Sequence, residues 1–193
     1  MPKPLIWQVG ADDRITSVNE AFVEYATANK APHLDERIIG QSTWEHITGA
    51  EAEHIYRQLF DRVRECGARV SFDYRCDTPD RRRILNLTIQ SKPEGVLDFT
   101  STVVQEFPRP SMAIIDADVD RSAEMVVMCS SCKKVENRDR WLELEQAVNQ
   151  MGLFRSEPIP RVSHGLCPDC EAEFTALIES IDFPPLDPSI ASA

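Results

Sequence analysis

Residues 70–76, Val-Ser-Phe-Asp-Tyr-Arg-Cys, alternate apolar and polar side chains and open the most regular stretch of the chain. The same alternation recurs over residues 85–90 and 97–103, and turn-forming residues separate the three runs. A period of two is typical of antiparallel strands that have one buried and one solvated face. The stretch therefore predicts three consecutive antiparallel strands. The predicted solvated face of the first strand carries Ser71, Asp73, Arg75 and Asp77.

A long amphipathic helix is predicted immediately before these strands. Apolar side chains recur from Ala52 to Val63 at i, i+3, i+4, i+7, i+8 and i+11, which forms a continuous stripe. Thr48 or Gly49 begins this helix, and Gly67 ends it. The stripe predicts that one face of the helix is buried.

The N-terminal segment predicts a hairpin followed by a helix. Two β-rich runs, 5–9 and 14–18, flank turn residues, and Asn19 is suited to cap a helix over residues 20–29. Short helical turns are expected between residues 38 and 47. The predicted order is thus two strands, a helix, short helical turns, a second helix and three strands.

This order, together with local motifs, resembles a PAS domain over residues 1–107. The motifs are the Asp-Asp-Arg-Ile-Thr-Ser-Val-Asn-Glu-Ala-Phe opening at 12–22, the Ile39-Gly40 pair, and the long helix that leads into three strands. The resemblance implies an α+β fold, in which a five-stranded antiparallel sheet has helices over one face. It also implies a homodimer that senses rather than catalyses, with a small ligand such as haem, a flavin or a metabolite between helices and sheet.

No motif in the PAS-like segment specifies a cofactor. Haem in PAS proteins is usually held by a histidine, often on the long helix, but His54 falls off the apolar stripe and is expected to face solvent. His46, beside Trp44, is better placed to face inward, as a core side chain or a ligand. The Asn-Cys-Arg-Phe-Leu motif of flavin photosensors is absent. Gln105 shares the parity of the inward side chains and could face a cavity. The ligand stays unassigned.

Composition and charge narrow the class of protein. The 193 residues are 42% hydrophobic, which is enough for a packed core in one ordinary domain or two small ones. A formal net charge of −11 repels phosphate backbones and disfavours nucleic-acid binding by the whole chain. No apolar run approaches the ~18 residues of a membrane span, and no signal-peptide pattern begins the chain. We expect a cytoplasmic protein without membrane association.

The C-terminal half predicts a separate small α/β module. Residues 108–124, rich in Pro, Asp and small side chains, form the predicted linker, within which residues 112–115 could pack. The predicted module covers residues 125–181 and begins with a strand. Residues 182–193 form a Pro-rich tail that is predicted to be disordered. One amphipathic helix of the module is expected over Trp141, Leu144, Ala147, Val148 and Met151.

Two CxxC pairs carry the most specific signal in the chain: Cys129-Ser-Ser-Cys132 and Cys167-Pro-Asp-Cys170. Each CxxC turn places two sulfurs on one side of a tight loop, and two such turns supply four thiolates for a closed, tetrahedral Zn²⁺ site. Buried free cysteines and a thioredoxin-like dithiol are the alternatives, although no βαβ pattern flanks either pair. A covalent haem site would need a histidine directly after a pair, and none is there.

Residues around the cysteines fit a zinc site. Lys133 and Lys134 follow the first pair, in a run that resembles the knuckle of a treble-clef zinc finger, and their charges offset those of the thiolates. The second pair opens a predicted helix over residues 171–178, whose N-terminus stabilises thiolates. His164 is an alternative fourth ligand, or a hydrogen-bond partner of a sulfur. Residues 128–174 also resemble a C-terminal extension of bacterial PAS-containing signalling proteins.

These observations predict a non-catalytic regulator that acts through contact with an unidentified signalling protein. No Ser/His/Asp set, phosphate loop or motif-placed carboxylate pair is present, and four thiolates leave zinc no open position for water. A thiol redox switch, in which oxidation ejects zinc, is one alternative. The other is nucleic-acid binding by a cationic cluster of the module. That cluster consists of Lys133, Lys134, Arg138 and Arg140.

Overall fold

The computed structural model describes residues 3–29, 34, 36–116, 118–153 and 158–182. The predicted tail lies outside these ranges, except for its first residue. The α-helices are α1 (Glu20–Ala28), α2 (Ala50–Cys66), α3 (Leu144–Gln150) and α4 (Pro168–Glu179). Short 3₁₀ turns are η2 (Glu36–Ile38), η3 (Thr43–His46), η4 (Pro93–Gly95) and η5 (Ala113–Ile115). The strands are β1 (Leu5–Val9), β2 (Ile15–Val18), β3 (Arg69–Arg75), β4 (Arg81–Ser91), β5 (Leu97–Pro108), β6 (Arg121–Cys129), β7 (Val135–Asn137), β8 (Arg140–Leu142) and β9 (Ile159–Gly165).

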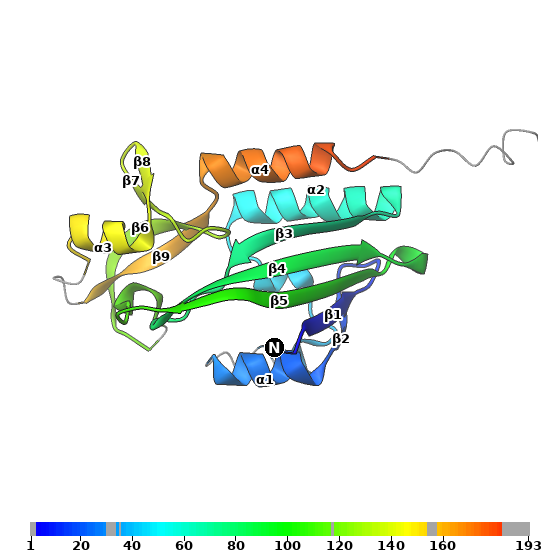
Figure 1. Cartoon of the computed structure of the whole chain (residues 1–193), viewed down its shortest axis with the longest axis horizontal. Coiled ribbons are helices and arrows are strands. Elements are labelled where there is room, and N and C mark those ends of the chain that lie inside the picture. The colour runs from blue at the N-terminus through cyan, green and yellow to red at the C-terminus, as the bar shows by residue number, and fades with distance from the viewer. Residues whose placement is uncertain (1–2, 30–33, 35, 117, 154–157, 183–193) are drawn as a thin grey trace, which may run out of the picture.

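Strands β1 to β5 form one antiparallel sheet in the order β2-β1-β5-β4-β3 (Figure 1). The three predicted strands pair in sequence, so that Phe72 lies opposite Leu87 and Leu87 opposite Ser101. The α+β class, the five-stranded sheet and the order of its strands and helices are therefore as the sequence predicts.

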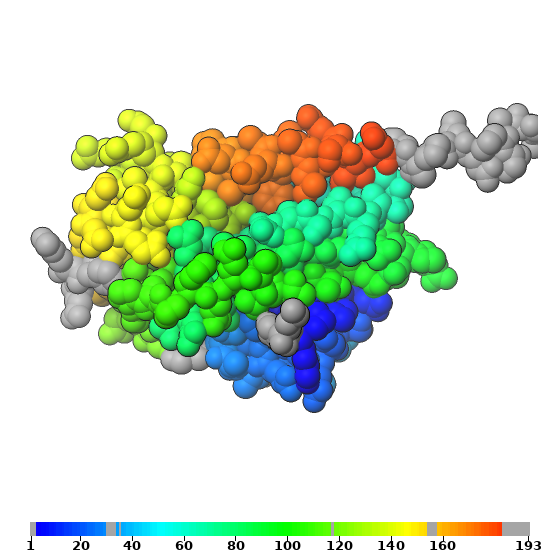
Figure 2. Space-filling view, viewed as in Figure 1, coloured from blue at the N-terminus to red at the C-terminus, as the bar shows by residue number. Residues whose placement is uncertain are grey.

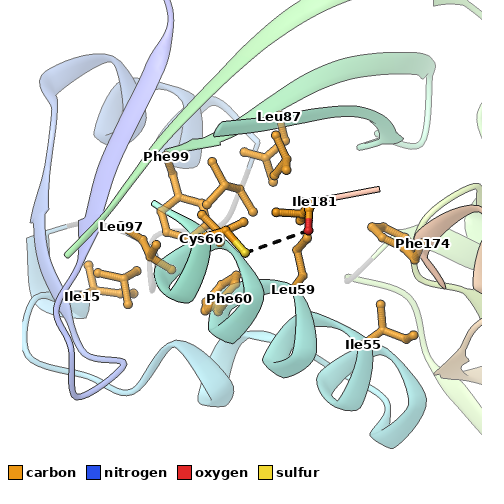
Figure 3. Close-up of a cluster of buried hydrophobic side chains, with 14 of the residues drawn as sticks. Ile15, Ile55, Leu59, Phe60, Cys66, Leu87, Leu97, Phe99, Phe174 and Ile181 are labelled. Atoms are coloured by element: carbon orange, nitrogen blue, oxygen red, sulfur yellow. Dashed lines mark hydrogen bonds between the residues drawn. The ribbon is translucent and has the colours of Figure 1, made fainter. Parts of the chain in front are cut away.

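One face of this sheet is apolar and is covered by helices. The stripe of α2 packs on it through Leu59 and Phe60, both almost inaccessible to solvent (Figure 3). Helix α1 packs on it through Ala21. The opposite face is polar, and there Asn86 donates a hydrogen bond to Asp73 at 2.8 Å. The alternation read from the sequence thus predicts which side of the sheet is covered.

The ends of the two long elements follow the predicted capping signals. The side chain of Asn19 accepts a hydrogen bond from the backbone N–H of Phe22 and caps α1. Gly67 has a φ of 60° and ends α2 in the left-handed conformation that glycine adopts without strain. Local chemistry therefore sets both boundaries.

Two residues of the sheet depart from the predicted alternation. A bulge in the pairing of β4 with β5 places Gln105 opposite Ile84, which reverses its parity, so Gln105 is exposed and does not face a cavity. Arg75 lies on the polar face as predicted, but only 5% of it is accessible to solvent. The C-terminal half of the chain covers this end of β3.

The second sheet has four strands in the order β8-β7-β6-β9, with β9 parallel to β6. Met112 and Ile114, from the predicted linker, are buried in the apolar cluster of this sheet, together with side chains of α3. The predicted helix is shorter than expected, because Trp141 belongs to strand β8 and not to α3.

Helix α4 returns to the first core. It runs along α2 (Figures 1 and 2), and its Phe174 packs against Phe72 with ring centroids 5.0 Å apart. Ile181, just after α4, is also buried there, and its carbonyl faces the thiol of Cys66 (Figure 3). None of the helices in the described ranges has the length and apolar character of a transmembrane segment.

Candidate metal centre

The structure brings the four predicted cysteines into one group. Their sulfur atoms all lie within 4.8 Å of one another, although the two pairs are far apart in the chain. Cys129, Cys167 and Cys170 are buried, and Cys132 is half-buried. The group can therefore hold a metal ion shielded from water.

The donor set and its dimensions fit zinc. A tetrahedral ion with Zn–S bonds of about 2.3 Å separates its sulfurs by about 3.8 Å. The sulfurs of Cys132 and Cys167 are 3.6 Å apart, and all six cysteines of the chain are free. Four such sulfurs complete the coordination of a structural site, which leaves no position for water.

The first pair is held by a tight backbone knuckle. The N–H of Cys129 donates to the carbonyl of Lys134 at 2.8 Å, and the N–H of Lys133 donates back to the carbonyl of Cys129 at 3.1 Å. Lys133 has a φ of 63°, which closes the turn. The knuckle at the end of β6 therefore presents both sulfurs on one side.

The second pair begins α4. Cys167 is the N-cap of the helix, and Cys170 lies in its first turn, after Pro168. Proline at this position supports a helix start, because its missing N–H would be unpaired there anyway. The free N–H groups and the dipole at this helix end favour negative charge nearby, such as a cluster of metal-bound sulfurs. The expected helix is thus confirmed, with its N-terminus at the cysteine group.

Without a cation the four thiols cannot ionise together. Hydrogen bonds from the thiols of Cys132 and Cys170 lower the pKa of Cys129, although burial opposes this. The contact with Cys129 in turn raises the pKa of Cys170 far above its usual range and that of Cys132 to about 12. One thiolate therefore forms at the expense of the others, whereas a divalent cation would stabilise all four.

Apolar side chains rather than α3 shield the group. Trp141 and Leu166 pack against the cysteines, while the apolar side chains of α3 belong to the neighbouring cluster. Trp141, which the sequence assigns to the amphipathic helix, thus shields the cysteine group from strand β8.

The four residues of the predicted cationic cluster lie in different surroundings. Lys134 forms an ion pair with Asp169 at 2.9 Å, and Lys133 donates to the carbonyl of Ser130 at 2.8 Å. Arg138 and Arg140 are exposed on the β7–β8 hairpin. The four cations therefore do not act as one free surface.

None of the histidines proposed as ligands joins the cysteine group. His164 lies in β9, three residues before Cys167, and is not part of the four-sulfur cluster. His54 is exposed, as expected, and contacts Gln58, while His46 is half-buried at the end of η3. A cavity of about 740 Å³ lies beside α1, where Trp7, Tyr25 and Arg83 are among its walls. No histidine is among the described residues that line it.

A buried ion-pair network connects the metal centre to the first sheet. Arg75 donates through its backbone N–H to Ser131 at 2.8 Å, and through Nη1 to the carbonyl of Cys132 at 3.0 Å. Its guanidinium also contacts Oδ2 of Asp77, and Arg109 contacts the same oxygen at 3.0 Å. The side chains of both arginines are 6% accessible, and that of Asp77 is 2% accessible.

Sequence patterns did not predict this network. Its signal is the spacing of Arg75 and Asp77 on one face of a strand, which also fits a solvated surface. Burial of both depends on Arg109 and on the cysteine knuckle, which are remote in sequence.

No protein-family model matches this sequence, and a search of curated proteins finds no match either.

Proposed function

We propose that the chain is a non-catalytic regulatory protein. In this proposal residues 1–107 are a PAS-type sensing and dimerisation module, and a structural Zn²⁺ bound by Cys129, Cys132, Cys167 and Cys170 stabilises the C-terminal module. The observation that carries the proposal is a closed, buried four-sulfur group whose own loop is bonded to the first sheet. The five-stranded antiparallel sheet with helices on its apolar face supports the PAS-type assignment.

The donor set supports a structural role for the metal. Four thiolates saturate a tetrahedral ion, so no ligand position is left for activating water. When bound, zinc supplies the cross-link between the knuckle and α4. The chain's own residues then hold the module on the sheet, and a change at the sheet reaches the module through Arg75.

Contacts at the start of α2 add a second connection. The hydroxyl of Ser130 donates to the carbonyl of Thr48 at 3.2 Å. Gly49, with a φ of 103°, lies so close to β9 that an added Cβ would come within 2.5 Å of the carbonyl oxygen of His164. Strand β3, through Arg75, and the start of α2 therefore both contact the C-terminal module. These contacts suit the transmission of a change from the first sheet to the module, whose surface would then meet a partner protein.

Native mass spectrometry of the purified protein tests the proposal directly. We expect one zinc per chain, and we expect Cys132→Ser to lose it, because three sulfurs no longer complete the site. Cys76→Ser is the matched control, since Cys76 is also half-buried but lies outside the group. Zinc retained by Cys132→Ser, or lost from both variants alike, would contradict the proposal. The same spectra report the oligomeric state.

A thiol redox switch is the second candidate, favoured by the 3.6 Å between the sulfurs of Cys132 and Cys167. Hydrogen peroxide would take two electrons from this pair of thiolates, form one disulfide, and leave as two hydroxides while zinc is released. Mild peroxide followed by native mass spectrometry separates the candidates. Loss of zinc, together with a decrease in mass of two hydrogens per disulfide, supports the switch. Retained zinc with four unmodified thiols refutes it.

A further inference from the structure

A second cavity, of about 570 Å³, lies along the β6–β9 pair, and basic residues dominate its polar lining. Arg121 comes from the start of β6, Lys133 from the knuckle, and Arg161 and His164 from β9. Met128 and Val162 supply apolar wall. A pocket with several converging cations and an apolar wall is the usual form of a site for an organic anion.

The cations of this cavity lack acidic partners. Among the described residues, no carboxylate oxygen lies within 4.0 Å of Arg121, Lys133 or Arg161. Arg121 donates only to backbone carbonyls, including those of Ile114 and Pro160, each at 3.0 Å. Carbonyls position a guanidinium but do not neutralise its charge.

Elsewhere in this chain, arginine side chains withdrawn from solvent have carboxylate partners. Each of four such side chains has a carboxylate oxygen within 4.0 Å, at Asp13, Asp77 or Glu106. These arginines are Arg64, Arg75, Arg83 and Arg109. In a chain with a net charge of −11, acidic partners are abundant, so the half-buried Arg121 without one calls for another source of negative charge, which the exposed Arg161 can share.

His164 adds an unused polar atom. Its Nδ1 is buried and has no hydrogen-bond partner within the part of the chain that the structure describes. The residue lines the cavity beside Val162, its neighbour on the same face of β9. Buried polar atoms are normally paired, so an orphaned ring nitrogen at a basic cavity suits a hydrogen bond to a bound group.

The negative groups near the cavity do not supply that partner. Asp77 also lines it, but Arg75 and Arg109 already contact its carboxylate. Lys133 already donates to the carbonyl of Ser130 at 2.8 Å, so Arg121 and Arg161 are the cations of the lining best able to bind a further anion. Two such charges match a doubly charged anion better than a single carboxylate.

We propose that this cavity binds a small organic phosphate, with the phosphate dianion on Arg121 and Arg161 and the organic part against Met128 and Val162. The basis is a cavity with unpaired cations and an orphaned imidazole nitrogen, and it is independent of the sensing role proposed for residues 1–107.

Isothermal titration of the zinc-loaded full chain tests this site. The probes are inorganic phosphate and phenyl phosphate, with chloride at equal ionic strength as the blank. We expect saturable binding of both, with phenyl phosphate the tighter because its ring reaches the apolar wall. No saturable binding of either probe overturns the proposal, and equal affinities overturn its organic part.

Arg161→Ala gives the decisive comparison. Arg161 is exposed at the cavity, and within the described ranges its side chain has no hydrogen bond or ion pair, so its removal leaves the fold intact. We expect a loss of affinity of about tenfold, as for one charge-assisted hydrogen bond. Arg140→Ala, an exposed arginine outside this cavity, is the matched control and should leave affinity unchanged. An equal loss in both variants would reveal attraction by general charge and would refute the site.

Discussion

The core under the five-stranded sheet and the core of the four-stranded sheet exclude water by different means. The first combines a 17-residue helix with strands of up to 12 residues, and it buries Leu59 and Ile89 completely. The second has a seven-residue α3 and two strands of three residues, β7 and β8. Elements this short bury little apolar surface, so the zinc cross-link that we propose would add stability where this core has least.

The junction between the two cores differs from both. Asp77, Arg75 and Arg109 are buried there as charges, while Phe174 of α4 reaches from the metal centre into the first core. A buried ion pair contributes little net stability, yet leaving one of its charges unpaired is strongly unfavourable. The network therefore fixes how the two cores meet more than it holds either together.

Removal of the metal should give the largest effect and should divide the molecule at this junction. After zinc is chelated, we expect backbone amides around Met128 and Val135 to lose protection against hydrogen exchange, because binding free energy of a structural zinc is folding free energy. Amides of Leu87 and Ile89 should keep their protection, since their core needs no metal. Hydrogen exchange measured by mass spectrometry follows both regions at once.

Addition of zinc to the chelated protein is the control, and it should restore protection around Met128. Loss of protection in both sheets to the same degree would show that the first core depends on the metal. Protection that persists everywhere would show that the second core stands without it.

Asp77→Ala should have the next largest effect. The change leaves Arg75 and Arg109 buried without a shared carboxylate, at a cost of about 3–5 kcal/mol in the free energy of unfolding. Asp73→Ala, in β3 four residues earlier and exposed, is the control and should cost under about 1 kcal/mol. Urea unfolding of the zinc-loaded variants measures both, and equal values would mean that the network does not join the cores.

The alternation of β3 to β5, the stripe of α2 and the caps at Asn19 and Gly67 could all be predicted because each depends on residues near in sequence. The grouping of four cysteines followed from CxxC spacing, a pattern with few uses. The sequence pattern does not indicate which other segment covers a strand. Arg75 lies on the predicted face, but its burial depends on the knuckle and on Arg109, which sequence periodicity does not encode.

Irregular pairing and short strands account for the other errors. The bulge that moves the side chain of Gln105 to the other face inserts one residue into β5, and no residue type there indicates a bulge. Trp141 has the spacing of the α3 stripe, yet it pairs with Glu136 in a three-residue ladder. In so short an element, period alone does not separate a strand from a helical turn.

Asn19→Ala should have the smallest effect and should stay within the first core. Its Oδ1 accepts from the N–H of Phe22 and of Ile6, so alanine leaves the end of α1 uncapped at a cost of about 1 kcal/mol. Asn19→Asp keeps this acceptor and loses only the amide donation to Pro4, so it should recover most of the stability. Urea unfolding measures the cost, and native mass spectrometry should find zinc unchanged in both variants. Loss of zinc from Asn19→Ala would mean that the end of α1 is coupled to the metal centre, and the separation into two cores would then be wrong.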